Sequence, residues 1–129
     1  MGKQIISTAM APKAVGPYSQ AVVYKNLLFI SGQIGTFPAD GKLPEAFAMQ
    51  AKNAFYNLKA IAESAGSRLN RSLKVTVYLT DINRFAEMNE IYTKFFIDEL
   101  PAREVVAVAG LPKNAQIEVS AIAYTRDDT

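Results

Sequence analysis

The chain has 129 residues, of which 50% are hydrophobic and 20% charged, and its formal net charge is +2. This length and composition are typical of one globular domain, so we expect residues 1–129 to fold as a single unit. The sequence contains neither histidine nor cysteine, which excludes disulfides, thiolate chemistry, Ser-His catalysis and the usual zinc ligands. The small net charge and the scattered basic residues give no reason to expect a nucleic-acid partner. With no long apolar run and no signal-peptide pattern, we expect a cytoplasmic protein.

The N-terminal third of the chain is predicted to form short strands. The apolar pair Ile5–Ile6 indicates a brief edge strand, and the Gly-Pro dipeptide at residue 16 indicates a turn. Residues 21–24 and 27–31 are apolar, suit strands, and flank a short Lys-Asn connection, which is the pattern of a β-hairpin. Residues 36–44 contain two prolines and an Asp-Gly pair, and we expect a loop there.

Two segments show the periodicity of amphipathic helices. Across residues 45–65, apolar side chains recur at steps of three and four, and Gly66 follows at a position that commonly ends a helix. We place Gln50 outside the buried stripe of this helix. A second helix is predicted to start at a cap formed by Asp81 or Asn83. Its buried stripe would consist of Phe85, Met88, Ile91, Tyr92 and Phe95.

Three further strands complete the predicted sheet. Residues 72–80 alternate between apolar side chains and a Thr- and Tyr-rich outer face. Residues 103–109 and 116–124 are joined by a Gly-Leu-Pro turn region, and we expect them to pair antiparallel. Directly opposed residues share a face of a sheet. One face would therefore carry Arg103, Val105, Ala107, Glu118, Ser120 and Ile122, and the core face would carry Val106, Val108, Ile117, Val119 and Ala121.

The order of these elements predicts an α+β domain with two layers. A mixed, mostly antiparallel sheet would carry two long helices on one face. The other face would be uncovered in a monomer, and a contiguous apolar surface usually marks an interface. The sequence therefore predicts an oligomer. The exposed residues of that face would include Tyr78, Val105, Ala107, Ile122 and Tyr124.

Arg103 and Glu118 are the candidate functional pair. Taken singly, each is most simply a charge at the solvated end or face of a strand. Taken together on a small apolar floor, they suggest a site for a short carboxylate-bearing molecule. An arginine binds a carboxylate through two parallel hydrogen bonds, and a glutamate can position and deprotonate a water molecule.

Three motifs in the chain resemble the RidA/YjgF/UK114 family. They are GPYSQA at residues 16–21, SGQIG at residues 31–35, and a C-terminal run over residues 101–123 of Pro-Ala-Arg, a Val/Ala strand, Leu-Pro-Lys, Ile-Glu-Val and Ala-Ile-Ala. They occur in the family's order and cover essentially the whole chain. The resemblance implies a YjgF-like (chorismate-mutase-like) fold. It also implies a homotrimer whose sheets form a central barrel, with pockets between subunits.

The same resemblance implies an enzyme that needs no cofactor or metal ion. Such an enzyme hydrolyses reactive 2-imino and 2-enamino acids, such as 2-aminoacrylate, to 2-oxo acids and ammonia, and so protects pyridoxal-phosphate enzymes from damage. Catalytic roles fall on Arg103 and Glu118. The substrate-binding positions that the family pattern supplies are Tyr18, Ser31, Gly32, Asn89 and Val105.

The chain departs from the family pattern at two positions. Val105 stands where many members have cysteine, and Ser120 stands where some members have a second acidic residue. Two other functions also stay open: a metabolite-binding or chaperone-like module without turnover, and an endoribonuclease, an activity attributed to some members. Arg103 together with Glu118 favours turnover, because binding alone needs only the arginine. The absence of histidine and of a basic patch disfavours RNA cleavage.

Overall fold

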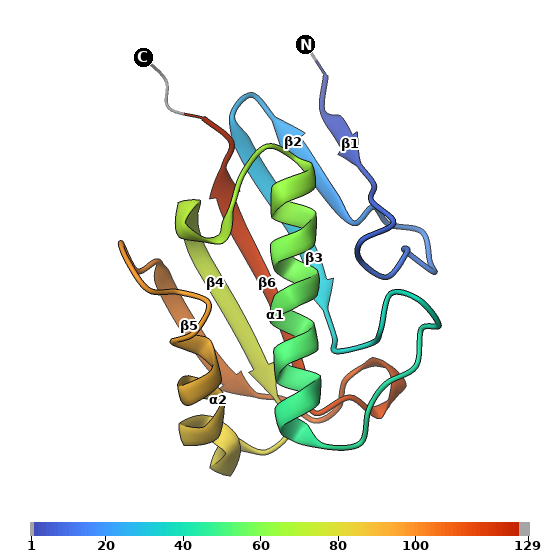
Figure 1. Ribbon diagram of the computed structural model, residues 1–129, viewed down its shortest axis with the longest axis vertical. Helices are drawn as coiled ribbons and strands as arrows, with labels where there is room; N and C mark the ends of the chain where they lie inside the picture. The colour runs from blue at the N-terminus through green and yellow to red at the C-terminus, as the bar shows by residue number, and fades with distance from the viewer. Residues whose placement is uncertain (1, 127–129) are drawn as a thin grey trace.

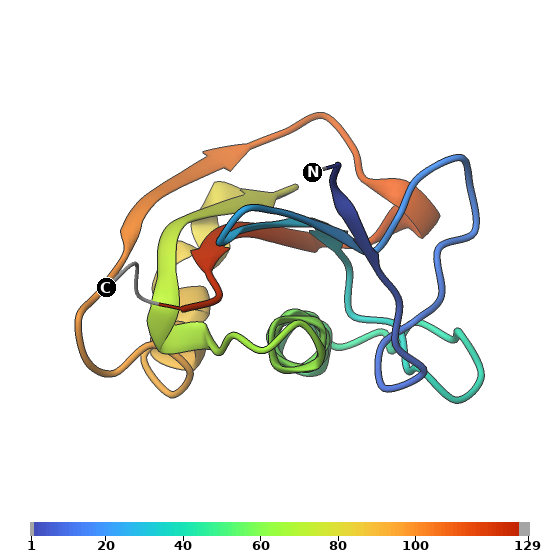
Figure 2. The same cartoon turned by 90° about the horizontal axis from the view of Figure 1, so that it is seen from above.

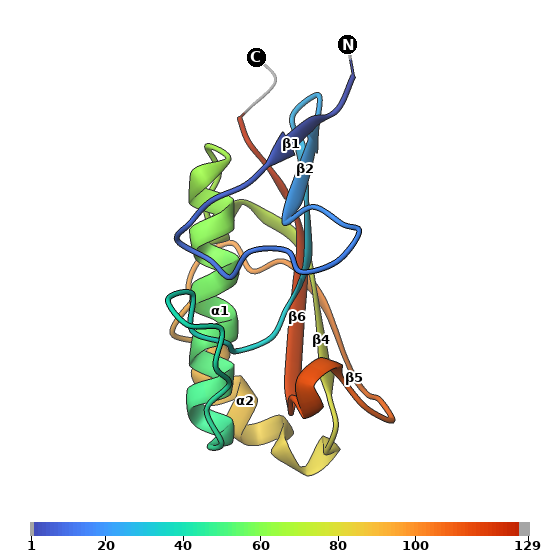
Figure 3. The same ribbon diagram turned by 90° about the vertical axis from the view of Figure 1, so that its right-hand side faces the viewer.

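A computed structural model of the protein describes residues 2–126 as a six-stranded sheet with two α-helices packed on one of its faces (Figures 1 and 3). This confirms the predicted two-layer α+β architecture. The strands are β1 (Gln4–Ile6), β2 (Ala21–Tyr24), β3 (Leu27–Gln33), β4 (Ser72–Leu79), β5 (Ala102–Ala107) and β6 (Ile117–Tyr124). The helices are α1 (Phe47–Ser64) and α2 (Phe85–Tyr92), with 3-10 turns at Leu69–Arg71, Ile82–Arg84 and Pro112–Asn114.

The strand order across the sheet is β1-β2-β3-β6-β4-β5. Neighbouring strands are antiparallel, except that β4 and β5 are parallel. The chain passes from β4 through α2 to β5, and a crossover that contains a helix is the usual way to join two parallel strands. The last strand, β6, is inserted between β3 and β4 (Figure 1).

The predicted hairpin of residues 103–109 with residues 116–124 is therefore wrong. β5 pairs with β4, which separates it from β6. Strands that follow each other in sequence often pair. Here the helical segment between residues 80 and 101 makes β5 pair with β4 instead of β6. It carries the chain back along the sheet, so that β5 starts at the same end as β4.

The correct pairing moves the two candidate catalytic residues to opposite faces of the sheet. Residues paired across a sheet point to the same side. Arg103 is opposite Val75, which is buried beneath the helices, so Arg103 points to the helix-covered face. Glu118 is opposite Tyr78 on the uncovered face. The prediction that Arg103 and Glu118 share a face is wrong for a single chain.

The core lies between the sheet and α1. Phe55, Leu58 and Ile61 of α1 are fully buried against the inner side chains of the sheet. Of the strand residues that were predicted to form the core, Ile117, Val119 and Ala121 are buried. Val106 instead has 43% of its surface exposed. Val105, which was predicted to be exposed, packs against the core from β5.

The uncovered face of the sheet is apolar across its first four strands. The register aligns Ile5, Val22, Phe29 and Ile122 in one row from β1 to β6. Ile5 and Phe29 are 54% and 43% exposed. Figure 2 shows α1 end-on against the opposite side of the sheet, where the helices lie. The predicted apolar surface is therefore present in the single chain, although Val105 and Ala107 are not part of it, since they pair with the core residues Val77 and Leu79.

Local hydrogen bonds mark the end of α1 and the approach to α2. After α1, Gly66 has a φ of 79°, and its N–H donates to the Glu63 carbonyl at 3.1 Å while the Ser67 N–H donates to the Ala62 carbonyl at 2.9 Å. These two bonds are the Schellman arrangement that glycine favours. Before α2, the Asp81 carboxylate caps a 3-10 turn. The second helix itself has only 8 residues, so it is shorter than predicted.

Gln50 was predicted to lie outside the buried stripe of α1, but it is buried in the contact between α1 and the loops. Its Nε2 donates to the Pro44 carbonyl at 2.8 Å, and its Oε1 accepts the backbone N–H of Gln116 at 2.8 Å. The amide therefore satisfies backbone groups of two loops at once, which explains why a polar side chain is buried here.

The loop after β3 is held against α1 at very close range. Asn57 donates to the carbonyls of Ile34 and Thr36 at 3.1 and 3.0 Å. Between them, Gly35 lies so near the helix that a Cβ atom there would be 2.1 Å from the Gln50 carbonyl oxygen. Only glycine permits this approach of two backbones.

We therefore expect Gly35→Ala to lower the free energy of unfolding by about 1–3 kcal/mol, because the added methyl group meets backbone that cannot move aside. Urea denaturation measures this change. The matched control is Gly110→Ala, since nothing lies within 4 Å of a Cβ at Gly110. Equal stability of the two variants would contradict the close packing of Gly35.

Candidate functional site

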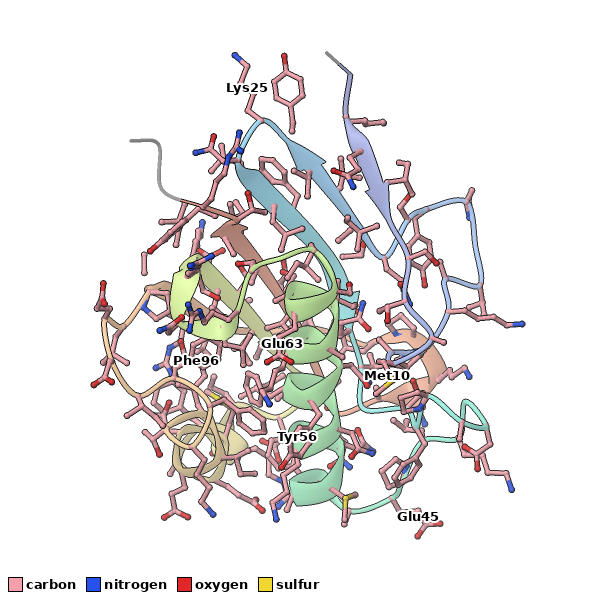
Figure 4. The ribbon with its side chains drawn as sticks, turned by 45° about the horizontal axis from the view of Figure 1, so that its top comes forward. Met10, Lys25, Glu45, Tyr56, Glu63 and Phe96 are labelled. Carbon is pink, nitrogen blue, oxygen red and sulfur yellow. The ribbon has the colours of Figure 1, made fainter. Side chains whose placement is uncertain are left out.

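A cleft of about 700 Å³ opens at one end of the sheet. Three segments line it: the N-terminal loop over residues 9–20, the end of β3 with the loop that follows, and the connection from β5 to β6. Met10 marks the N-terminal loop in Figure 4. The cleft brings together three of the predicted site residues, namely Tyr18, Gly32 and Glu118.

Glu118 lies directly over Gly32. A Cβ atom at Gly32 would be 2.6 Å from the carboxylate Oε2 of Glu118 and 2.7 Å from its Cδ. The register of β3 with β6 shifts between Ile30 and Gln33, so the strand is irregular where the glycine occurs. A side chain at position 32 would displace the Glu118 carboxylate, so Gly32 gives that carboxylate its place in the cleft.

Ser31 holds the loop that carries Tyr18. Its hydroxyl donates to the Ser19 carbonyl at 2.6 Å, and its backbone N–H donates to the Gln20 carbonyl at 2.9 Å. These bonds fix the segment just after Tyr18, whose side chain is 51% exposed beside the cleft. The hydroxyl of Ser31 is therefore engaged in shaping the cleft.

Gln20 is a residue of this region that sequence reasoning missed. It is buried, and its side chain bonds to two segments of the N-terminal loop. The Oε1 atom accepts the Thr8 N–H at 2.7 Å, and Nε2 donates to the Pro12 carbonyl at 2.8 Å. The signal was available, since Gln20 belongs to the GPYSQA motif.

The environment of Glu118 is only partly open to water. Burial raises the pKa of the Glu118 carboxyl above its usual value. A carboxylate with a raised pKa is a stronger base than an exposed one and suits proton abstraction from water.

A second cluster forms around Arg103 on the helix-covered side of β5. Its Nη1 donates to Oδ1 of Asn89 in α2 at 2.8 Å. The guanidinium carbon lies 4.6 Å from the centroid of the Tyr92 ring and 5.8 Å from that of Phe85. Val105 lies two residues further along the same face. The structure thus brings Arg103, Asn89 and Val105 together, and it adds the two aromatic rings.

The two clusters are far apart within one chain. β6 and β5 are separated by β4, which places them about 10 Å apart across the sheet. Tyr78 is paired with both Glu118 and Val106, so Glu118 is also about 10 Å further along the strands than Arg103. With the two side chains on opposite faces, no pocket of a single chain holds both.

Metal-binding groups are not gathered in this region. Within residues 2–126, no three acidic side chains lie close enough together to hold a metal ion. Over the same residues, no helix has the length and apolar character needed to cross a membrane.

The protein is a two-layer α+β domain that carries an arginine cluster and, separately, a cleft with a glutamate. Comparisons with known proteins identify its family. The family model described as Endoribonuclease L-PSP matches residues 8–125. The bovine protein named 2-iminobutanoate/2-iminopropanoate deaminase is 46% identical over 122 residues, which cover 94% of this chain and 89% of the bovine one.

Two solved structures are similar over nearly the whole chain. RidA from an Antarctic Psychrobacter has a TM-score of 0.92 and 46% identity, covering 94% of this chain and 98% of its own. Escherichia coli TdcF, solved with bound serine, has a TM-score of 0.91 and 42% identity, covering 96% of this chain and 99% of its own. The chain belongs to the RidA/YjgF family, as its motifs predicted.

The raised pKa of Glu118 makes a prediction that is independent of any activity. Because burial disfavours the ionised carboxylate, we expect Glu118→Gln to raise the melting temperature at neutral pH. The gain should shrink as the pH falls through the raised pKa of Glu118 and vanish below about 4, where the carboxyl is neutral in both the folded and the unfolded chain. Thermal unfolding across this pH range measures it. A lower melting temperature for the variant at neutral pH would contradict the burial argument.

Proposed function

We propose that this protein is a deaminase that hydrolyses 2-imino and 2-enamino acids to 2-oxo acids and ammonia without a cofactor. The observation that carries the proposal is that Arg103 and Glu118 stand at the family's motif positions. The Arg103 guanidinium is held by Asn89 and keeps N–H donors for a ligand, and Glu118 lines the cleft. The bovine relative's name and the serine bound to TdcF support it, because serine and 2-imino acids both carry a carboxylate on the carbon that bears the nitrogen.

We further propose that the complete site forms between two copies of the chain in a homotrimer. One copy would supply Arg103, Asn89 and Val105. The neighbouring copy would supply Tyr18, Ser31, Gly32 and Glu118. Two features support this arrangement: β5 ends the sheet and has one unpaired edge within the chain, and the uncovered face exposes a row of apolar side chains. A head-to-tail interface that closes after three copies gives three equal pockets around a central barrel.

In this site, Arg103 would bind the substrate carboxylate through two hydrogen bonds. Glu118 would take a proton from a water molecule, whose oxygen attacks the imine carbon, and would pass that proton to the substrate nitrogen. The hydroxyl proton of the resulting carbinolamine then passes to its nitrogen, the C–N bond breaks to release ammonia, and the C=O bond of the 2-oxo acid forms. Backbone groups near Val105 would orient the nitrogen. An enamine must first gain a proton at carbon and lose one from nitrogen to become the imine.

The biological role that fits this chemistry is the removal of reactive intermediates. Imines and enamines released by pyridoxal-phosphate enzymes can attack those enzymes. Hydrolysis of these compounds in the cytoplasm would protect the enzymes. The proposal gives the protein small-molecule substrates and copies of itself as partners.

Two alternatives are separated from the proposal by one set of assays. The family model carries the name of an endoribonuclease, and the same pockets could bind a metabolite without turnover. Ammonia and 2-oxo acid release from freshly generated 2-aminoacrylate should be faster with the protein than without it, while RNA in a parallel reaction stays intact. RNA cleavage, or binding with no turnover, would replace the proposed activity.

We expect Arg103→Ala to lower kcat/KM for imine hydrolysis about 100-fold or more, because losing one partner of a charge-assisted pair costs about 2–5 kcal/mol. Arg103→Lys should also be poor, since a lysine cannot form the paired hydrogen bonds. Glu118→Gln should depress kcat and leave the binding of a 2-oxo acid nearly unchanged. Unaltered turnover in Arg103→Ala would show that the arginine does not bind the substrate.

We expect sedimentation equilibrium at micromolar concentration to give three times the mass of the chain. The trimer should persist in Arg103→Lys, because a pocket residue contributes little to the apolar interface. A monomer at these concentrations would contradict the shared site, since one chain keeps Arg103 and Glu118 on opposite faces.

A further inference from the structure

We propose that Tyr92 is a positioning residue for Arg103, whose ring face orients the guanidinium for the substrate carboxylate. This inference rests on the proposed function, which gives Arg103 its role as the carboxylate ligand. It adds a residue that lies in α2 and would not itself touch the substrate.

The first observation is the geometry of the guanidinium. Arg103 lies on an edge strand and is exposed, and an arginine in that setting normally samples many rotamers. Here two contacts define its position: the 2.8 Å hydrogen bond to Asn89 Oδ1, and the Tyr92 ring centroid at 4.6 Å from the guanidinium carbon. Asn89 engages one nitrogen, and the ring face restricts the tilt of the whole group.

The second observation is that Tyr92 is itself held rigidly. Its ring stacks on Phe96 with a centroid distance of 4.4 Å and an interplanar angle of 19°, and it meets Phe55 edge-on at 5.7 Å. The Tyr92 ring thus contacts Phe96, Phe55 and the Arg103 guanidinium at the same time. Phe55 is fully buried in α1. The stack thus anchors an exposed arginine to the centre of the core.

This anchoring would favour substrate binding in a specific way. Arginine has five N–H donors in a planar fork. Once Asn89 has accepted one of these bonds, the remaining donors can still form the paired bonds to a carboxylate. A guanidinium that is ordered before binding loses less conformational freedom when the substrate arrives. Loss of the ring should therefore weaken binding and change the chemical step little.

The interaction with Tyr92 is a cation–π contact rather than an ion pair. Burial is the larger influence on the Tyr92 hydroxyl, and it raises the pKa of that group, although the nearby Arg103 charge acts in the other direction. The tyrosine therefore stays neutral at working pH. What attracts the cation is the electron-rich ring face, and a phenylalanine would provide that face as well.

The simpler explanation is that Tyr92 only fills the core between α1 and α2. Phe95 allows the two explanations to be separated, because it packs against the same aromatic cluster. Its ring lies 5.3 Å from Phe55 and 5.0 Å from Tyr56. Within the part of the chain that the structure describes, the rings that Arg103 covers are those of Phe85 and Tyr92. Phe95→Leu is thus the matched control.

The experiment measures the Kd of 2-oxobutanoate by calorimetry, with KM and kcat for imine hydrolysis, in folded variants of the full chain. We expect Tyr92→Leu to raise the Kd and the KM about twofold to thirtyfold, the range of a cation–π contact, with kcat nearly unchanged. Tyr92→Phe should behave as the wild type. Phe95→Leu should lower the melting temperature without changing the Kd.

A double-mutant cycle with Arg103→Ala locates the effect. If Tyr92 acts through the arginine, Tyr92→Leu will change neither constant further once Arg103 is absent. An unchanged Kd in Tyr92→Leu, an equal rise in Phe95→Leu, or an effect that persists in the Arg103→Ala background would each overturn the inference. The proposed function fails separately, if Arg103→Ala alone alters neither binding nor turnover.

If Tyr92→Leu does not fold, a series of fluorinated phenylalanines at position 92 decides the question. Fluorine preserves the shape of the ring and withdraws electron density from its face. The Kd should then rise with each added fluorine. A constant Kd across the series would overturn the inference.

Discussion

The parallel pairing of β5 with β4 is the constraint on which the candidate site depends. It follows from the α2 crossover, and it directs Arg103 towards α2, where Asn89 and Tyr92 hold its guanidinium. Because β6 lies on the other side of β4, Glu118 is separated from Arg103 across the sheet, and its pairing with Tyr78 places it on the uncovered face. A chemistry that needs an arginine and a glutamate at one substrate must therefore bring two copies of the chain together.

Local patterns predicted the elements of this fold well. Apolar periodicity located α1 to within two residues of each end, and the Lys-Asn connection marked the β2–β3 hairpin. The pairing of β5 could not be read from its own residues, since an apolar strand accepts either neighbour. Gln50 shows a second limit: its burial depends on two loops that need backbone donors and acceptors satisfied, and no helical periodicity contains that information.

The sequence predicted the residues of the glutamate cleft but missed the aromatic contacts of Arg103. Motif positions identified Tyr18, Gly32 and Glu118, and the structure gathers them in one cleft. The reason for glycine at position 32 emerged only from the approach of the Glu118 carboxylate. The aromatic support beneath Arg103 was missed because Tyr92 belongs to the buried stripe of a helix, where an aromatic side chain is normally explained by packing alone.

The central claim is that each site is shared by two copies, and mixed oligomers test it most directly. Arg103→Ala and Glu118→Gln chains with different tags would be co-expressed and purified through both tags in turn. In a ring of three, every mixed trimer then contains one pocket with both residues intact, so imine hydrolysis should recover to about a third of the wild-type rate. Activity that remains at the level of the two separate variants would contradict the shared site.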